Sequence, residues 1–81
     1  MSISAAQSRG ARGLLDMNQS DLAEASGVSA RTIQNFESGN RQPIQANLAA
    51  LRAALEKAGV EFIAENGGGP GVRLEKSKAK R

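Results

Sequence analysis

The chain has no cysteine, histidine, tryptophan or tyrosine among its 81 residues. The absence of cysteine excludes a disulfide framework, so a hydrophobic core must hold the fold together. Without cysteine and histidine there is no zinc finger, no imidazole metal site and no Cys–His nucleophile pair, and we expect neither a metal nor a cofactor. No apolar run approaches the roughly 18 residues that a membrane span needs. Since MSISAAQSRG also lacks the apolar stretch of a secretory signal, the sequence predicts one small cytoplasmic domain with no membrane partner.

The positive charge is concentrated at the C-terminal end. Residues 73–81 hold five basic residues and one acidic residue, net +4, whereas residues 1–72 hold six basic and seven acidic residues, net −1, which together give +3. Residues 76–81 are therefore expected to form a disordered basic tail. Such a tail is either a solvated end that aids solubility or an arm that seeks phosphate groups.

Capping residues and hydrophobic spacing predict four helices. Ser4 followed by Gln7 is a capping-box pattern, and Asn18 and Ser29 are good N-cap residues for the second and third helices. Glycines stand where the later helices are expected to end. The helices are expected at about residues 5–15, 19–26, 30–38 and 45–58.

The pattern changes after Gly59, where two short runs alternate with a period of two. These runs, VEFI at 60–63 and VRLE at 72–75, flank a Gly/Pro-rich loop and predict a β-hairpin over about residues 60–75; the alternative is a tail without strands. Val60 and Phe62 are expected to cap the core, because so short a chain has little core to spare. The fold class is thus mainly α, with a four-helix domain at 1–58, a hairpin extension at 59–75 and the tail at 76–81.

The segment QSDLAEASGVSARTIQNFES, residues 19–38, has the composition of two short helices packed about a tight turn. Ala23 is small enough for the following helix to cross, and Gly27 supplies the positive φ that the turn needs. Apolar side chains between and beneath the two helices complete a helix-turn-helix pattern. They are Leu22, Val28, Ile33 and Phe36.

The spacing Gln-x-x-Leu-Ala-x-x-x-Gly-Val-Ser-x-x-x-Ile-x-x-x-Glu-x-Gly-x-x-x-Pro resembles the phage-repressor/Cro-type, XRE-like helix-turn-helix family. The resemblance covers about residues 4–58. The segment GVEFIAENGGGPGVRL also looks like the C-terminus of short bacterial regulators of this type. The resemblance implies a sequence-specific transcriptional regulator that binds double-stranded DNA and reads the major groove with its third helix.

The resemblance also implies roles for individual residues. Arg31 is suited to guanine, and Gln34 or Asn35 to adenine. Helical geometry agrees, since Ile33 and Phe36 face inward while Arg31 and Asn35 lie on another face; the alternative is a plain solvated face. The base-reading positions are Ser29, Ala30, Arg31, Gln34 and Asn35, and the phosphate-contacting positions are Gln19, Ser38, Asn40, Arg41 and Gln42.

Arg12 and Glu37 occupy the positions of an ion pair found in some members of the family. Such a pair joins the first helix to the end of the third, and its role is structural rather than catalytic. The alternative is that both side chains face solvent.

Three features depart from the pattern of a DNA reader. Ala30 stands where the family often has a polar residue, the body of the chain is slightly acidic, and Asp21 and Glu24 would repel a nearby phosphate. An alternative function is therefore a protein-binding antiactivator or adaptor that uses the same scaffold and docks on a regulatory protein. An enzyme is not expected, because no carboxylate is paired with a positioned base.

A single reading helix covers few base pairs, so a homodimer on two half-sites is the expected DNA-binding species. An edge of the hairpin is a candidate for the dimer contact, by strand addition.

Overall fold

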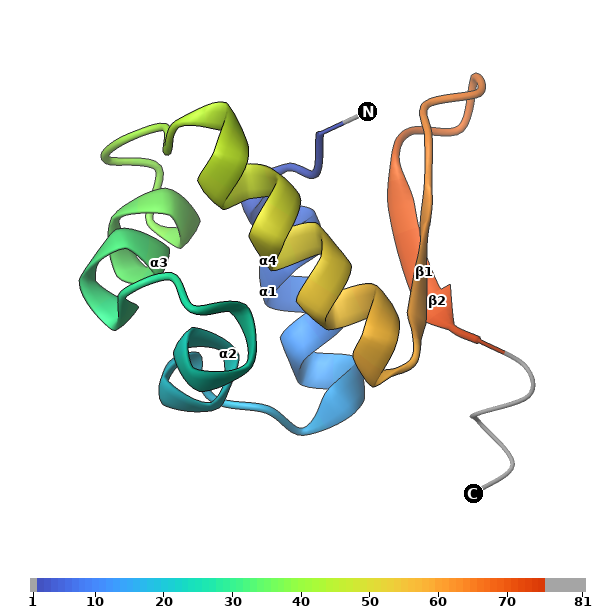
Figure 1. Cartoon of the computed structure of the whole chain (residues 1–81). Coiled ribbons are helices and arrows are strands. Elements are labelled where there is room, and N and C mark those ends of the chain that lie inside the picture. Colours follow the sequence, from blue (N-terminus) through green and yellow to red (C-terminus); the bar gives the residue numbers. More distant parts are fainter. Residues whose placement is uncertain (1, 76–81) are drawn as a thin grey trace.

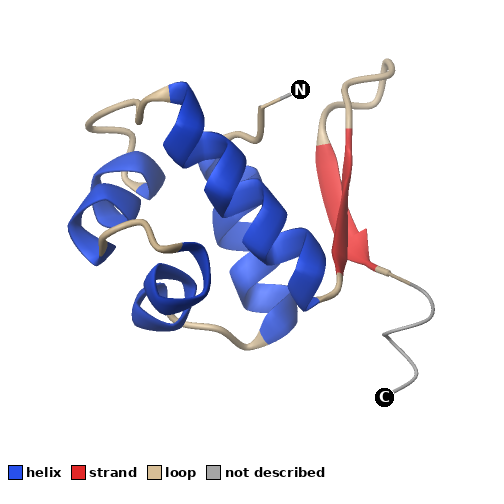
Figure 2. Cartoon of the chain, viewed as in Figure 1, coloured by secondary structure: helices blue, strands red, loops and turns tan. Residues whose placement is uncertain are grey.

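The computed structural model describes residues 2–75, which fold into four helices and a two-stranded antiparallel sheet (Figure 1). The arrangement is mainly helical, as Figure 2 shows, and confirms the predicted fold class. The expectation for residues 76–81 lies outside the described residues. The elements are α1 (Ala5–Leu15), α2 (Gln19–Ser26), α3 (Ala30–Glu37), α4 (Gln45–Ala58), β1 (Val60–Ile63) and β2 (Gly71–Leu74).

The helix ends follow the predicted caps closely. In α1, the Ser4 hydroxyl accepts from the Gln7 N–H while the Gln7 side chain accepts from the Ser4 N–H. Gly27 ends α2 in the left-handed region, at φ 77°, where a residue without Cβ is least strained. Helix α3 ends at Glu37, one residue earlier than expected, because Ser38 is its C-cap.

The core lies where the four helices meet, and β1 closes it. Leu22 of α2, Ile33 of α3 and Leu51 of α4 are completely buried. Val60 at the start of β1 belongs to the same cluster, and Phe62 packs against it partly buried. The expectation that these two residues cap the core is confirmed.

The hairpin packs beside α1 and α4, on the far side of these helices from α3 (Figure 1). The strand register pairs Val60 with Leu74 and Phe62 with Val72. The Gln7 side-chain amide donates to the backbone carbonyls of Ile63, at 3.4 Å, and Gly71, at 2.9 Å, so one side chain ties both strands to α1.

Within residues 2–75, none of the helices combines the length and the apolar character that crossing a lipid bilayer requires.

Candidate nucleic-acid interface

Helix α3 lies at one end of the molecule and has two distinct faces (Figure 1). Ile33 and Phe36 are buried against the rest of the domain, as their spacing predicts. Arg31 and Gln34 are exposed and Asn35 is half-buried, so polar side chains line the face that points away from the core. This face presents hydrogen-bond donors and acceptors of the types that recognise base edges.

Ser29, the N-cap of α3, and Ala30, its first residue, differ in what they can offer to a ligand. The Ser29 hydroxyl accepts from the Thr32 N–H, at 3.1 Å, and donates to the Thr32 hydroxyl, at 2.9 Å. The Ser29 side chain is therefore engaged in capping the helix. Ala30 is exposed and presents only a methyl group.

The backbone carbonyl of Asn35 organises the loop that follows α3. It accepts from the N–H of Asn40 at 2.9 Å, from the N–H of Arg41 at 3.2 Å, and from the Ser38 hydroxyl at 3.2 Å. Three of the expected phosphate-contacting residues are thus held by the same residue whose side chain lies on the polar face of α3. Gln42, a fourth, is exposed beyond them.

The Glu37 carboxylate is the centre of a buried polar cluster that joins α1, α2 and α3. Glu37 is only 3% exposed. Arg12 donates to it through Nε, at 3.0 and 3.1 Å, and through Nη2, at 2.6 Å. The Ser8 hydroxyl donates at 2.6 Å and the Gln19 side-chain amide at 3.2 Å. Arg12 and Glu37 therefore form an ion pair, and neither is simply a solvent-facing charge.

Protonation within this cluster is biased towards the charged pair. Burial raises the pKa of Glu37, but the hydrogen bonds from Arg12, Ser8 and Gln19 outweigh burial and leave the pKa below its ordinary value. The hydrogen bond to Glu37 raises the pKa of Arg12, against the effect of burial. Arg12 also donates to the Met17 carbonyl at 3.0 Å, which fixes the connection from α1 to α2.

Gln19 connects this cluster to the expected DNA surface. It is the first residue of α2, and its side-chain amide is held by Glu37. The backbone N–H groups at the start of a helix have no partner within that helix and suit a phosphate oxygen. The carboxylate of Asp21, however, accepts from the Asn18 N–H at the same helix end.

Sequence reasoning missed two residues of the cluster. Ser8 is fully buried, and Arg9 donates to the backbone carbonyl of Glu37 at the end of α3. Ser8 lies one helical turn before Arg12, and this i, i+4 spacing is the signal that places both on the face towards Glu37. The Arg9 contact has no comparable signal, because its partner is a backbone group of another helix.

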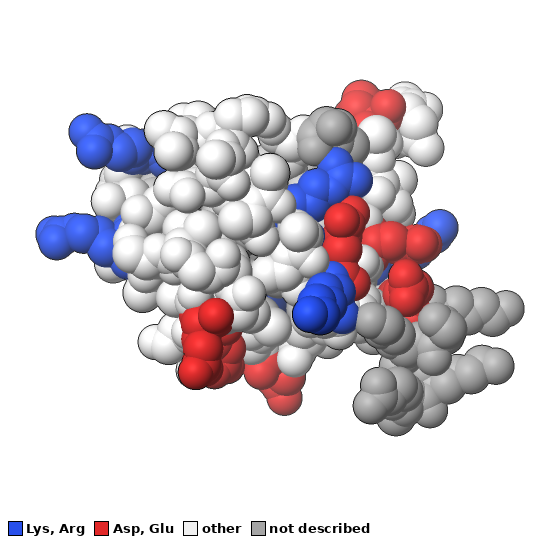
Figure 3. Space-filling view, viewed as in Figure 1, with Lys and Arg blue, Asp and Glu red and all other residues white. Residues whose placement is uncertain are grey.

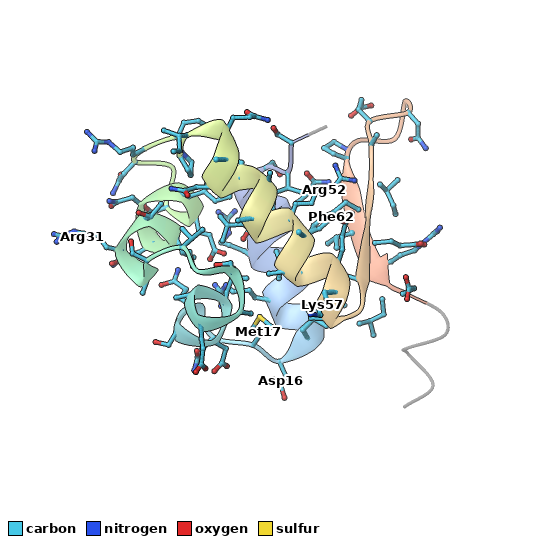
Figure 4. The ribbon with its side chains drawn as sticks, in the orientation of Figure 1. Asp16, Met17, Arg31, Arg52, Lys57 and Phe62 are labelled. Carbon is cyan, nitrogen blue, oxygen red and sulfur yellow. The ribbon has the colours of Figure 1, made fainter. Side chains whose placement is uncertain are left out.

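Basic side chains lie at the end of the molecule formed by α3, whereas acidic side chains lie on the neighbouring helix α2. Figure 3 shows basic side chains projecting at the end of the molecule formed by α3 and its following loop, and acidic side chains along α2. The exposed basic residues of that end are Arg31 and Arg41, and the exposed acidic residues of α2 are Asp21 and Glu24. Arg31 extends away from the body of the protein (Figure 4).

In a comparison with known protein families, the model of the helix-turn-helix family matches residues 9–62. The match contains all of α2, α3 and α4 and ends within β1. No curated protein matches the chain.

Proposed function

The chain belongs to the XRE-like helix-turn-helix family of DNA-binding transcription regulators, and from this premise we propose that it reads a specific duplex sequence with α3. The observation that carries the proposal is the exposed polar face of α3, which stands at the end of the molecule opposite the hairpin (Figure 4). A helix of this width fits the major groove.

Three side chains of α3 are proposed to read base edges. Arg31 donates to O6 and N7 of a guanine, while Gln34 and Asn35 pair with adenines. Ala30 contributes an apolar contact to a thymine methyl group, and Ser29 acts by holding the start of the helix through its cap.

A second group of residues is proposed to position α3 on the duplex through the phosphates. Gln19 presents the start of α2 to one strand, and the loop after α3 presents Ser38, Asn40, Arg41 and Gln42. These contacts fix orientation without reading sequence. The acidic residues of α2 make the total electrostatic attraction weak for a DNA binder, so sequence-specific contacts and a second copy of the chain are needed for affinity. We propose that a homodimer occupies two half-sites.

The test is selection of a preferred duplex from a random pool, followed by binding measurements at two salt concentrations. Arg31→Ala is expected to weaken binding to the selected duplex about 5- to 150-fold and to relax the preference at one base pair. Arg41→Ala is expected to weaken binding to all duplexes equally. It should also lower the slope of the logarithm of the binding constant against the logarithm of the salt concentration by about 1 in magnitude. Arg52→Ala, on the hairpin side of α4, is the matched control and should leave binding unchanged (Figure 4).

Failure to select any sequence at low salt would overturn the proposal. The adaptor function, in which the same face of α3 binds a regulatory protein, would then be the hypothesis to pursue.

A further inference from the structure

The tip of the hairpin loop carries a pair of residues, Asn66 and Gly67, that has no part in the proposed function. The chain has five asparagines, and Asn66 is the one that is followed by glycine. Asn66, Gly67 and Gly68 are all exposed, and the loop projects beyond the helices at one end of the hairpin (Figure 1). A side-chain amide therefore lies next to a backbone N–H in contact with water, with no side chain between them.

The backbone around Gly67 is open. Gly67 has φ 101° and Gly69 has φ 88°, conformations that glycine adopts with little strain. A Cβ added to Gly67 would meet nothing within 4 Å. Water and hydroxide therefore reach the Gly67 nitrogen, and the loop can move without disturbing packed side chains.

The Asn66 side chain folds over the peptide group that follows it. Its Oδ1 accepts from the Gly68 N–H at 3.3 Å, which makes an Asx turn. Because the Gly67 N–H lies between these two groups along the chain, the turn brings Cγ of Asn66 beside the Gly67 nitrogen. An electrophilic carbon and a nucleophile in the same short segment react without the entropy cost of bringing two molecules together.

The Gly67 N–H makes a hydrogen bond that is easily broken. It donates to Oε2 of Glu65 at 2.9 Å, and the same oxygen accepts from the Gly69 N–H at 3.1 Å. Both bonds are exposed, so water replaces them at a small net cost. Glu65 thus shapes the loop but does not withdraw the Gly67 nitrogen from reaction.

The other asparagines are held in geometries that oppose the same reaction. Asn35 and Asn47 lie within α3 and α4, where the helical hydrogen bonds engage the following N–H. The N–H after Asn40 donates to the Asn35 carbonyl, and the Asn18 side chain caps α2 through the Asp21 N–H. Each of these asparagines is also followed by a residue with a large side chain.

We propose that Asn66 is a site of spontaneous deamidation, with water as the co-reactant. Hydroxide takes the proton of the Gly67 N–H, and the nitrogen attacks Cγ of Asn66. The new N–Cγ bond closes a succinimide ring, and the Cγ–Nδ2 bond breaks. The departing Nδ2 takes a proton from water and leaves as ammonia, which restores the hydroxide. Water then opens the ring at Cγ, which gives aspartate, or at the main-chain carbonyl carbon, which gives isoaspartate.

Deamidation changes the charge of the loop and leaves the fold in place. Either product carries a carboxylate that is ionised at neutral pH, so residues 1–72 lose one unit of charge and change from net −1 to net −2. In isoaspartate the chain runs through Cβ and the Asx turn is lost, but an exposed loop tip tolerates such a change. Helix α3 lies on the far side of α1 and α4 from the hairpin (Figure 1). The inference therefore does not depend on the proposed function.

The test is incubation of the folded full chain in neutral buffer for increasing times, followed by tryptic digestion and mass spectrometry. Asn66 is the one asparagine in the peptide 58–73, and the other asparagines fall in the peptides 13–31, 32–41 and 42–52. The acid should accumulate in peptide 58–73 alone, as both aspartate and isoaspartate, and faster as the pH is raised. The intact chain should shift to a lower isoelectric point. A sample digested without incubation measures the background of the digestion.

Two variants test the chemistry, and the chain unfolded in guanidinium chloride is the positive control for conversion. Gly67→Ala should slow the conversion because its methyl group hinders ring closure, although the strain of alanine at this φ loosens the loop and acts in the opposite direction. Asn66→Gln, whose longer side chain would have to form a larger ring, should remain an amide. Absence of conversion at Asn66 in the folded chain, equal conversion at the other asparagines, or undiminished conversion in Gly67→Ala overturns the proposal.

Discussion

Gly10 of α1 and Val72 of β2 are packed so closely that a Cβ on Gly10 would lie 3.2 Å from Cγ1 of Val72. The glycine is a poor helix former, but its missing side chain lets the hairpin lie directly on α1. The hairpin is thereby attached to the same helix that supplies Arg12 and Ser8 to the cluster beneath α3.

Gly10 and Gly13 form a matched pair for testing this contact. Gly13→Ala is expected to raise the free energy of unfolding by about 1 kcal/mol, because alanine favours the helix and its Cβ enters open space. Gly10→Ala should gain less or lose stability, since Val72 must move to accommodate the Cβ. The measurement is urea unfolding of the two variants and the wild type at the same protein concentration. Equal gains in the two variants would contradict the close packing.

The buried ion pair gives a second prediction. Glu37→Ala leaves Arg12 without its partner and removes the acceptor of Ser8 and Gln19, so it should cost about 3 kcal/mol. Glu56→Ala also breaks an ion pair, that with Arg52, but on the surface, and should cost less than about 1 kcal/mol. If thermal scans gave the two variants the same melting temperature, the buried ion pair of Glu37 would contribute no more to stability than the exposed pair of Glu56.

Acid should destabilise the protein through the same carboxylate. The pKa of Glu37 in the folded chain lies below its ordinary value of 4.5, so the unfolded chain takes up the proton first as the pH falls. The stability that Glu37 contributes is therefore complete above about pH 4.5 and is lost as the pH falls through the lowered pKa. Glu37→Gln is the control, because it does not titrate. Its free energy of unfolding, followed by denaturant titration between pH 7 and pH 3, should decline less than that of the wild type; parallel curves would contradict the assignment.

The helices were predictable because their signals are local. Ser4 and Gln7, Asn18, and Ser29 each cap the helix that directly follows, so neighbouring residues suffice to place its start. The polar face of α3 follows in the same way from the 3.6-residue period, as the exposed Arg31 and buried Ile33 illustrate.

The contacts between distant segments could not be predicted in this way. Gln7 reads as a capping residue, and nothing near it in the sequence indicates that its amide reaches strands more than fifty residues away. From the sequence alone, Gly10 is only a residue that weakens its helix. Its role becomes clear from the structure, in which Val72 packs against it. Both roles depend on tertiary packing, which the spacing of residues along one helix does not encode.

The dual role of Gln7 gives a last prediction. In Gln7→Glu the side chain keeps an oxygen to accept from the Ser4 N–H, so the cap of α1 is retained. The amide that donates to the Ile63 and Gly71 carbonyls is replaced by an oxygen, which repels both. A buried group left unsatisfied costs about 1–3 kcal/mol, and here the loss should fall on the hairpin rather than on the helices. Hydrogen exchange should therefore speed up at the N–H groups of Ile63 and Gly71 while the core amides of α3 and α4 keep their protection. Gln45→Glu, an exposed substitution at the start of α4, controls for the added charge. Uniform loss of protection across all elements would mean that Gln7 supports the whole domain and not the attachment of the hairpin.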